Sequence, residues 1–210
     1  MTRPLLRGWL HEVAFVLAIP ASIVLVVLAR AGTDRAAAIV YGIGLCALFG
    51  VSASYHRGHW SERAKRWWQR ADHGTIFVMI AATYTPICLV LLHGSTGTKL
   101  LWAVWIAAGV GLVLALAGIS MKYGIGFFLY LAMGWVAAFA MPEIARRASP
   151  TEIVLLLSGG LAYTVGAVIL AGRWPNPFPR IFGYHELWHS LVIAASACHY
   201  VVILAVLRAT

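Results

Sequence analysis

Histidines in two parts of the sequence have the spacing of metal ligands. Residues 185–189 read HELWH, so His185 and His189 are four residues apart and lie on one face of a helix. Two imidazoles presented in this way can bind one metal ion. His56 follows Ser52 at the same spacing and can supply a third imidazole. Three histidines leave one position of a zinc ion open for water, as in catalytic zinc sites.

Asp72 and Ser52 are the candidate catalytic residues beside this metal site. The Asp72 carboxylate can take a proton from a water molecule, and the Ser52 hydroxyl can position that water or a developing oxyanion. A simpler interpretation makes Asp72 an acid favoured by the helix dipole and Ser52 a residue that bonds back to its own helix. Polar side chains in membrane helices are costly, which favours a functional role for the whole group.

The pentapeptide HELWH also fits the H-E-x-x-H pattern of zinc proteases, in which the glutamate is the general base. Intramembrane proteases of this kind need an acidic third ligand, for which Asp72 is the candidate. That interpretation leaves Ser52 and His56 without a role. We therefore expect Glu186 to face headgroup water or a neighbouring helix.

Two further histidines lie outside this group. His199 is ten residues beyond the HELWH segment, about 15 Å deeper along a helix, so we expect a buried hydrogen bond there. His11 precedes Glu12 at the start of the first apolar segment. A supporting role for His11 is open.

The composition places these residues in a membrane protein. Of 210 residues, 61% are hydrophobic and 11% are charged, and the mean hydropathy is +0.84; soluble domains carry roughly 25% charged residues. The net charge of +9 comes from basic residues in short gaps between apolar segments, which indicates a membrane surface and no nucleic acid partner. The three scattered cysteines form neither a disulfide framework nor a C-x-x-C site. We predict a single integral membrane domain over residues 1–210.

Seven apolar segments approach the roughly 20 residues that cross a membrane. They are expected at about 12–30, 36–56, 73–92, 99–119, 124–141, 152–171 and 185–207. None alternates in polarity as a membrane strand would, so the fold class is all-α, a seven-transmembrane helix bundle. The N-terminal segment also has features of a signal peptide, but its apolar stretch is long and Arg30 follows directly, which favours an uncleaved first span.

The distribution of lysine and arginine predicts the orientation of the bundle. One side carries ten of these residues, Arg3 and Lys122 included, against six on the other, which places the N-terminus inside and the C-terminus outside. Most of the excess lies in residues 57–72, which form either an interfacial helix against anionic headgroups or a solvated basic turn. The proline-rich residues 173–183 are expected to be non-helical.

This topology brings the polar residues to one depth near the inner membrane face. The second span ends there, and the third and seventh spans begin there. The residues concerned are Ser52, His56, Asp72, His73, His185 and His189.

Three motifs resemble those of a known membrane family. They are S-x-x-x-H at 52–56, D-H-x-x-I at 72–76 and H-x-x-x-H at 185–189. TYTP at 83–86 and GG at 159–160 match as well. The chain resembles bacterial hemolysin III proteins, within the progestin and adipoQ receptor family, over nearly all seven spans. It departs at Ala82, Leu170 and Tyr184, where Gly, Tyr and often His are expected, and all motif residues are retained.

The resemblance implies seven helices with the N-terminus inside and a zinc ion held by His56, His185 and His189. It also implies that Asp72 lies beside the zinc water, with Ser52 as a neighbour. The wider superfamily includes alkaline ceramidases, which hydrolyse lipid amides. Bacterial members are named for haemolysis and are linked to membrane homeostasis.

We therefore expect a zinc-dependent hydrolase of a lipid-like amide or ester in the bacterial cytoplasmic membrane, with membrane lipids as partners. The alternative is a non-enzymatic sensor, homeostasis or pore-forming protein, in which zinc ties two helices together and Asp72 is a fourth ligand. A permanent channel is disfavoured because no span carries a regular row of polar residues. Imidazole ligands also suit copper, nickel and iron, so zinc is a preference.

Overall fold

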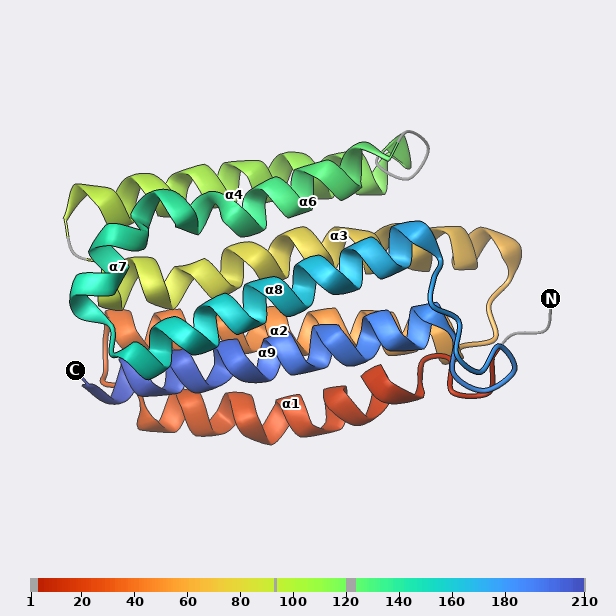
Figure 1. The fold of residues 1–210 in the computed structure, drawn as a ribbon, viewed down its shortest axis with the longest axis horizontal. Helices are drawn as coiled ribbons and strands as arrows, with labels where there is room; N and C mark the ends of the chain where they lie inside the picture. Colours follow the sequence, from red (N-terminus) through yellow and green to blue (C-terminus); the bar gives the residue numbers. More distant parts are fainter. Residues whose placement is uncertain (1–3, 93, 120–123, 210) are drawn as a thin grey trace.

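The computed structural model describes residues 4–92, 94–119 and 124–209 (Figure 1). Within these ranges, seven helical segments are long and apolar enough to cross a membrane, which confirms the predicted number and class. The elements are α1 (Trp9–Leu28), α2 (Thr33–Arg57), α3 (Glu62–Pro86) with the π-helical η1 (Ile87–Leu91), α4 (Ser95–Leu116), α6 (Ile125–Trp135) with the 3-10 helix η2 (Val136–Ala140) and α7 (Met141–Arg147), α8 (Pro150–Gly172) and α9 (Tyr184–Ala209).

The largest difference from the predicted spans is at the start of α3. It begins at Glu62, where the Ala64 N–H donates to the Ser61 hydroxyl at the N-cap. Residues 62–72 of the basic, tryptophan-rich segment are therefore the first turns of α3 and are continuous with the third span. The third span has 30 residues, about 45 Å of helix, whereas the bilayer hydrocarbon is about 30 Å thick. Its basic end is thus long enough to project beyond the hydrocarbon.

The fifth span is irregular and is supported from α3. It continues to Arg147, past the predicted end near residue 141. In its last turns, Arg147 pairs with Glu143 at 3.2 Å. At its 3-10 segment, the Tyr84 hydroxyl accepts a hydrogen bond from the Ala137 N–H at 2.8 Å. The same hydroxyl lies 3.0 Å from the Met133 carbonyl oxygen. Tyr84 belongs to the TYTP motif, so this motif stabilises the break in the fifth span.

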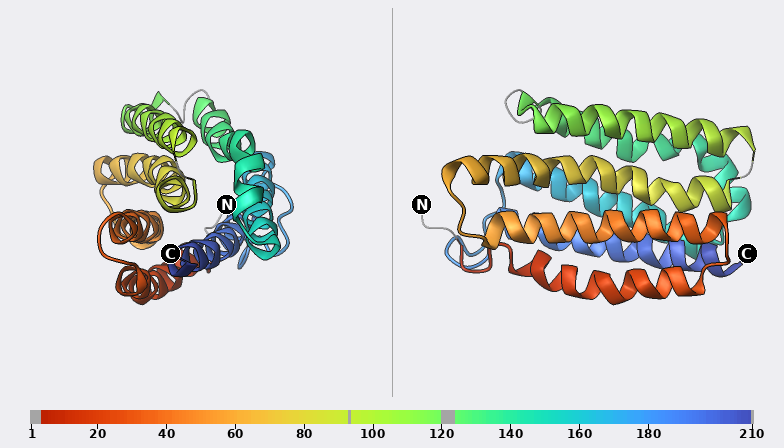
Figure 2. Two further views of the ribbon diagram at one scale, coloured as in Figure 1. Left: turned by 90° about the vertical axis from the view of Figure 1, so that its left-hand side faces the viewer. Right: turned by 180° about the vertical axis from the view of Figure 1, so that it is seen from behind.

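The seven spans form a ring in sequence order (Figure 2). Each span packs against the next, and α9 packs against both α8 and α1, which closes the ring. The start of α1 and the α2–α3 and α8–α9 connections lie at one end, and the end of α9 lies at the other (Figure 1). The α8–α9 connection is non-helical, as predicted. Which end faces the cytoplasm stays a prediction, and Arg3 and Lys122 lie outside the described residues.

The outer surface of the ring is apolar. On α1, Val16 and Leu17 are about 60% exposed, and on α4 Trp102 and Val113 are 66% exposed. Soluble monomers rarely expose large contiguous apolar surfaces, so this surface fits contact with lipid.

Close helix contacts account for two features of the sequence. A Cβ atom on Gly159 of α8 would lie 2.4 Å from Nε2 of His199, so only glycine lets α9 approach here. Ala82, at a position where glycine is expected, is fully buried, and a Cβ on Gly44 would lie 2.6 Å from its methyl group. Gly44 thus makes room for the side chain of Ala82. Leu170, the second departure, packs against the buried core.

Candidate metal centre

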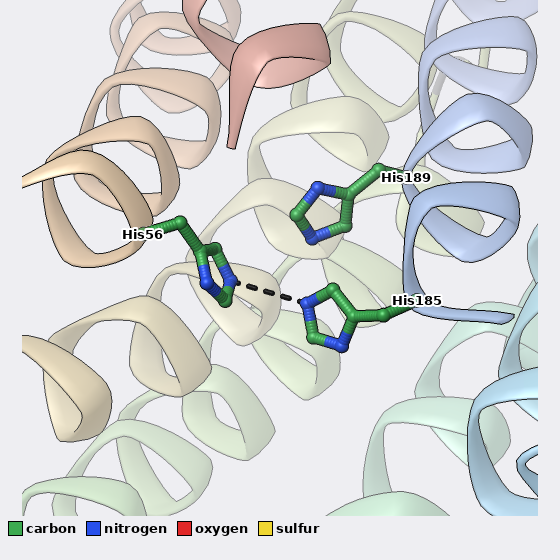
Figure 3. A group of neighbouring side chains, drawn as sticks. All are labelled: His56, His185 and His189. Carbon is green, nitrogen blue, oxygen red and sulfur yellow. Dashed lines mark hydrogen bonds between the residues drawn. The ribbon is translucent and has the colours of Figure 1, made fainter. Parts of the chain in front are cut away.

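Three histidines meet where α2 ends and α9 begins (Figure 3). His56 lies in the last turn of α2, and His185 and His189 lie in the first turns of α9. One ligand atom from each of the three side chains lies within 4.8 Å of the other two. His56 and His189 are buried and His185 is partly buried. The three histidines predicted from spacing therefore form one cluster.

The distances within this cluster fit a single metal ion. Nε2 of His185 lies 3.2 Å from Nε2 of His56. Two nitrogens bound tetrahedrally to zinc at about 2.0–2.1 Å are separated by about 3.3 Å. The His189 ring centroid lies 4.6 Å from that of His185 and 5.1 Å from that of His56. A metal ion therefore requires only small side-chain adjustments.

Asp72 and Ser52 lie next to the three histidines, as the sequence predicted. Oδ2 of Asp72, on α3, is 3.9 Å from Nε2 of His56. Ser52 is buried one turn before His56 on α2, and its side chain interacts with Asp72. Both residues line the same cavity as the three histidines, and so does His73. All six polar residues expected at one depth thus surround one space.

Glu186, the second residue of the HELWH segment, faces the N-terminal segment. It is only 1% exposed, and its carboxylate forms an ion pair with Arg7. The other carboxylate oxygen accepts a hydrogen bond from the Gly183 N–H at 2.9 Å. Both oxygens are engaged, and the third imidazole comes from His56. This arrangement favours the three-histidine interpretation over the protease interpretation.

The N-terminal segment pairs with the connection that leads into α9. The Leu5 N–H donates to the Arg180 carbonyl at 3.0 Å, and the Leu6 N–H donates to the Ile181 carbonyl at 3.2 Å. Gly8 then has a φ of 83°, and a Cβ atom there would lie 2.7 Å from Cβ of His56. Both the left-handed backbone and the lack of space require glycine at this position.

His11, on α1, stacks on the candidate ligand His189. The ring centroids are 3.7 Å apart and the planes differ by 7°. His11 is 3% exposed, and neither ring nitrogen has a hydrogen-bond partner within the described residues. Burying such groups is costly. His11 is not among the three clustered ligands, so the structure gives it a supporting position.

A cavity of about 740 Å³ extends from the three histidines into the bundle. Its lining reaches from Tyr184 to His199 along α9, about 22 Å along the helix axis. The deeper walls are largely apolar and include Ile76, Leu131 and Val192. His199 Nε2 lies 3.2 Å from the Leu156 carbonyl, the hydrogen bond expected for it. The volume is typical of a site for a small organic molecule.

Comparison with known proteins identifies the family. The family model described as Haemolysin-III related matches residues 1–200. The chain belongs to the Haemolysin-III related family. The match includes all three sequence motifs as well as the N-terminal segment that carries Arg7 and His11.

Relatives in this family include both bacterial and animal proteins. Hemolysin-3 of Bacillus cereus is 31% identical over 191 residues, covering 89% of this chain and 84% of that protein. The Hemolysin-3 homolog of Bacillus subtilis (strain 168) is 30% identical over 197 residues, covering 92% and 89%. Monocyte to macrophage differentiation factor of Homo sapiens is 29% identical over 171 residues, covering 80% and 68%. The chain is thus a multi-pass membrane protein with bacterial relatives over most of its length.

Proposed function

We propose that this protein is a zinc-dependent hydrolase of a lipid-like amide or ester, located in the bacterial cytoplasmic membrane with its N-terminus inside. One observation carries the proposal: the three-histidine cluster lies beside Asp72 and Ser52 at one end of a long, mostly apolar cavity. His56, His185 and His189 would hold the metal. When bound, zinc supplies Lewis-acid chemistry, because it polarises a carbonyl and makes water more acidic.

The remaining chemistry falls to Asp72 and Ser52. In hydrolysis the water oxygen bonds to the carbonyl carbon, and the bond to the leaving nitrogen or oxygen breaks. Asp72 accepts the proton from water and returns it to the leaving group. The Ser52 hydroxyl donates a hydrogen bond to the oxygen on which negative charge develops.

The cavity indicates why the substrate would be a lipid. Its apolar part follows α9 into the bundle, where an acyl chain can replace water. The polar residues lie at the end of the ring that carries the α2–α3 and α8–α9 connections. A lipid lying along α9 would therefore present its amide or ester carbonyl to the three histidines.

The main alternative is a non-enzymatic protein in which zinc joins α2 to α9. The observation that favours it is the 3.9 Å separation of Asp72 and His56, which is short enough for Asp72 to become a fourth ligand after a small movement. Structural zinc sites usually have four protein ligands. A sensor, homeostasis or pore-forming role would then follow, the last in keeping with the name Hemolysin-3 of two relatives.

Asp72→Asn distinguishes the two functions. If Asp72 is the catalytic base, the substitution lowers hydrolysis of a panel of lipid amides and esters at least about 100-fold. The zinc content of the purified protein then stays unchanged. If Asp72 is a structural ligand, the substitution removes zinc and lowers the thermal unfolding temperature. Asp34→Asn, near the start of α2 at the opposite end of the ring, is the matched control and should leave both hydrolysis and zinc content unchanged. Zinc-loaded wild type that hydrolyses no member of the panel would contradict the enzymatic proposal.

A further inference from the structure

The charges that line the cavity are unbalanced. Among the described residues, the lining includes three strongly basic side chains, Arg7, Lys65 and Arg173, and a single carboxylate, Asp72. Arg7 is paired with Glu186, and Asp72 lies beside His56. Ion pairs within the described part of the chain involve neither Lys65 nor Arg173. Two basic side chains of the lining, Lys65 and Arg173, are therefore outside the ion pairs of the described residues.

Lys65 lies on the face of α3 that forms one wall of the cavity. The lining residues of this helix recur at helical spacing: Lys65, Gln69, Asp72, His73, Ile76, Met79, Ile80, Thr83 and Tyr84. Lys65 is seven residues before Asp72, two turns or about 10 Å along the axis, and its side chain is exposed. It therefore lies at the outer end of the wall that carries the candidate base.

Arg173 lies on another wall, immediately after α8. The α8–α9 and α2–α3 connections are at the same end of the bundle, so Arg173 and the start of α3 both lie at this end (Figure 1). In the ring, α3 and α8 are not sequential neighbours. A group at the mouth of the cavity thus has a basic side chain on each of two walls.

The backbone of Arg173 is unusual. Its φ is 53°, the single positive φ of a non-glycine residue in the described ranges. Glycine is the usual residue in this left-handed position after a helix, yet here Gly172 precedes it and arginine occupies it. This conformation is costly for a residue with a side chain. This costly conformation holds an arginine beside the cavity.

We propose that Lys65 and Arg173 form a subsite for the phosphate of an anionic lipid headgroup. This inference rests on the proposed hydrolase and names its substrate class: an acyl lipid that carries a phosphate as well as an amide or ester. Arginine binds phosphate through two parallel hydrogen bonds, and lysine adds a compact positive charge. The apolar lining deeper in the cavity takes the acyl chain.

Basic residues at this end of the bundle can also act through general surface charge, as in membrane orientation. Basic residues outside the cavity therefore serve as matched controls. Arg63 and Arg66 are exposed neighbours of Lys65 on α3, with the same charge, but they do not line the cavity. A general effect of surface charge would depend equally on all three residues. A headgroup subsite depends on Lys65 and not on Arg63 or Arg66.

The test compares retention of two lipids by the full-length protein in neutral detergent, measured by native mass spectrometry. The probes are dioleoyl phosphatidic acid and dioleoylglycerol, which share acyl chains and differ in the phosphate. Wild type should retain the phosphate lipid at least tenfold better. Lys65→Gln and Arg173→Gly should each weaken this preference roughly fivefold, while Arg63→Gln and Arg66→Gln should leave it unchanged. Because glycine suits the backbone at 173, Arg173→Gly should keep or raise the unfolding temperature.

Three results would overturn the subsite. Wild type that retains both lipids equally has no phosphate preference, and an equal loss in Arg63→Gln and Lys65→Gln assigns the preference to surface charge. If inorganic phosphate displaces the lipid at equal concentration, the site binds free phosphate and is not a lipid headgroup subsite. Retention and hydrolysis are separate readouts, so hydrolysis of neutral lipids without a phosphate preference would refute the subsite and keep the hydrolase. A phosphate preference without hydrolysis of any lipid would keep the subsite and refute the hydrolase.

Discussion

The rings of His11 and His189 lie face to face, with centroids 3.7 Å apart and planes only 7° from parallel. This stack joins α1 to α9, where the ring of helices closes, and it involves one of the three clustered histidines. Residues that hold a metal ligand in place affect metal binding without touching the metal. We therefore regard His11 as a positioning residue.

Replacing His11 tests this role. His11→Ala should lower zinc affinity by about tenfold or more, because the His189 ring loses the surface that fixes its plane. His11→Phe keeps an aromatic ring and should retain most of the affinity. The measurement is competition for zinc with a chromophoric chelator, and His199→Ala is the control, since His199 bonds to Leu156 away from the cluster. If His11→Ala lowers only the unfolding temperature and binds zinc as wild type does, the positioning role is wrong.

The ion pair between the partly buried Arg7 and the buried Glu186 should contribute to stability more than to metal binding. Arg7→Ala leaves the Glu186 carboxylate buried without its charged partner and should destabilise the protein by about 3 kcal/mol. Adding Glu186→Gln should recover part of this loss, because the buried charge is removed. Unfolding in detergent measures both effects. Glu143→Gln is the control, because its pair with Arg147 is more exposed and should contribute about 1 kcal/mol or less.

Glu186→Gln alone should retain zinc, and any activity should fall no further than the loss of stability explains. A zinc-protease mechanism makes the opposite prediction, because the glutamate of H-E-x-x-H is then the general base. Zinc-loaded, folded Glu186→Gln protein without activity would therefore restore the protease interpretation.

Gly8→Ala should disturb the metal centre through His56. The substitution adds strain at a φ of 83° and places a methyl group 2.7 Å from Cβ of His56. Gly124→Ala is a matched control, because its φ is 67° and a Cβ there meets nothing within 4 Å. Both variants should lose about 1 kcal/mol to backbone strain, but only Gly8→Ala should lose zinc affinity. Equal zinc affinities would show that the N-terminal segment does not position His56.

The sequence was sufficient to predict the spans and the three histidines. Each span is long and apolar enough to be found from hydropathy, and the i,i+4 spacing of His185 and His189 shows that they share a helix face. The start of α3 was missed because hydropathy does not distinguish the polar first turns of a helix from a loop. Ser61 at the N-cap was the available local indication.

The contacts that support the site were not predictable in the same way. Arg7 and Glu186 are 179 residues apart in the sequence, and the stack of His11 on His189 requires α1 to pack against α9. No local pattern encodes either pairing. Lys65 and Arg173 were counted only as orientation charges, since the cavity that they line exists only in the folded ring. The left-handed conformation of Arg173 is equally invisible in the sequence.

The most direct measurement is the metal content per chain of the detergent-purified protein, for wild type and for His56→Ala, His185→Ala and His189→Ala, with His199→Ala as the control. The three-histidine centre predicts about one zinc per chain in wild type and control, and loss of zinc in each of the other three variants. Wild type that stays folded without metal would contradict the centre. Retention of zinc in His56→Ala alone would show that the third ligand is a different residue.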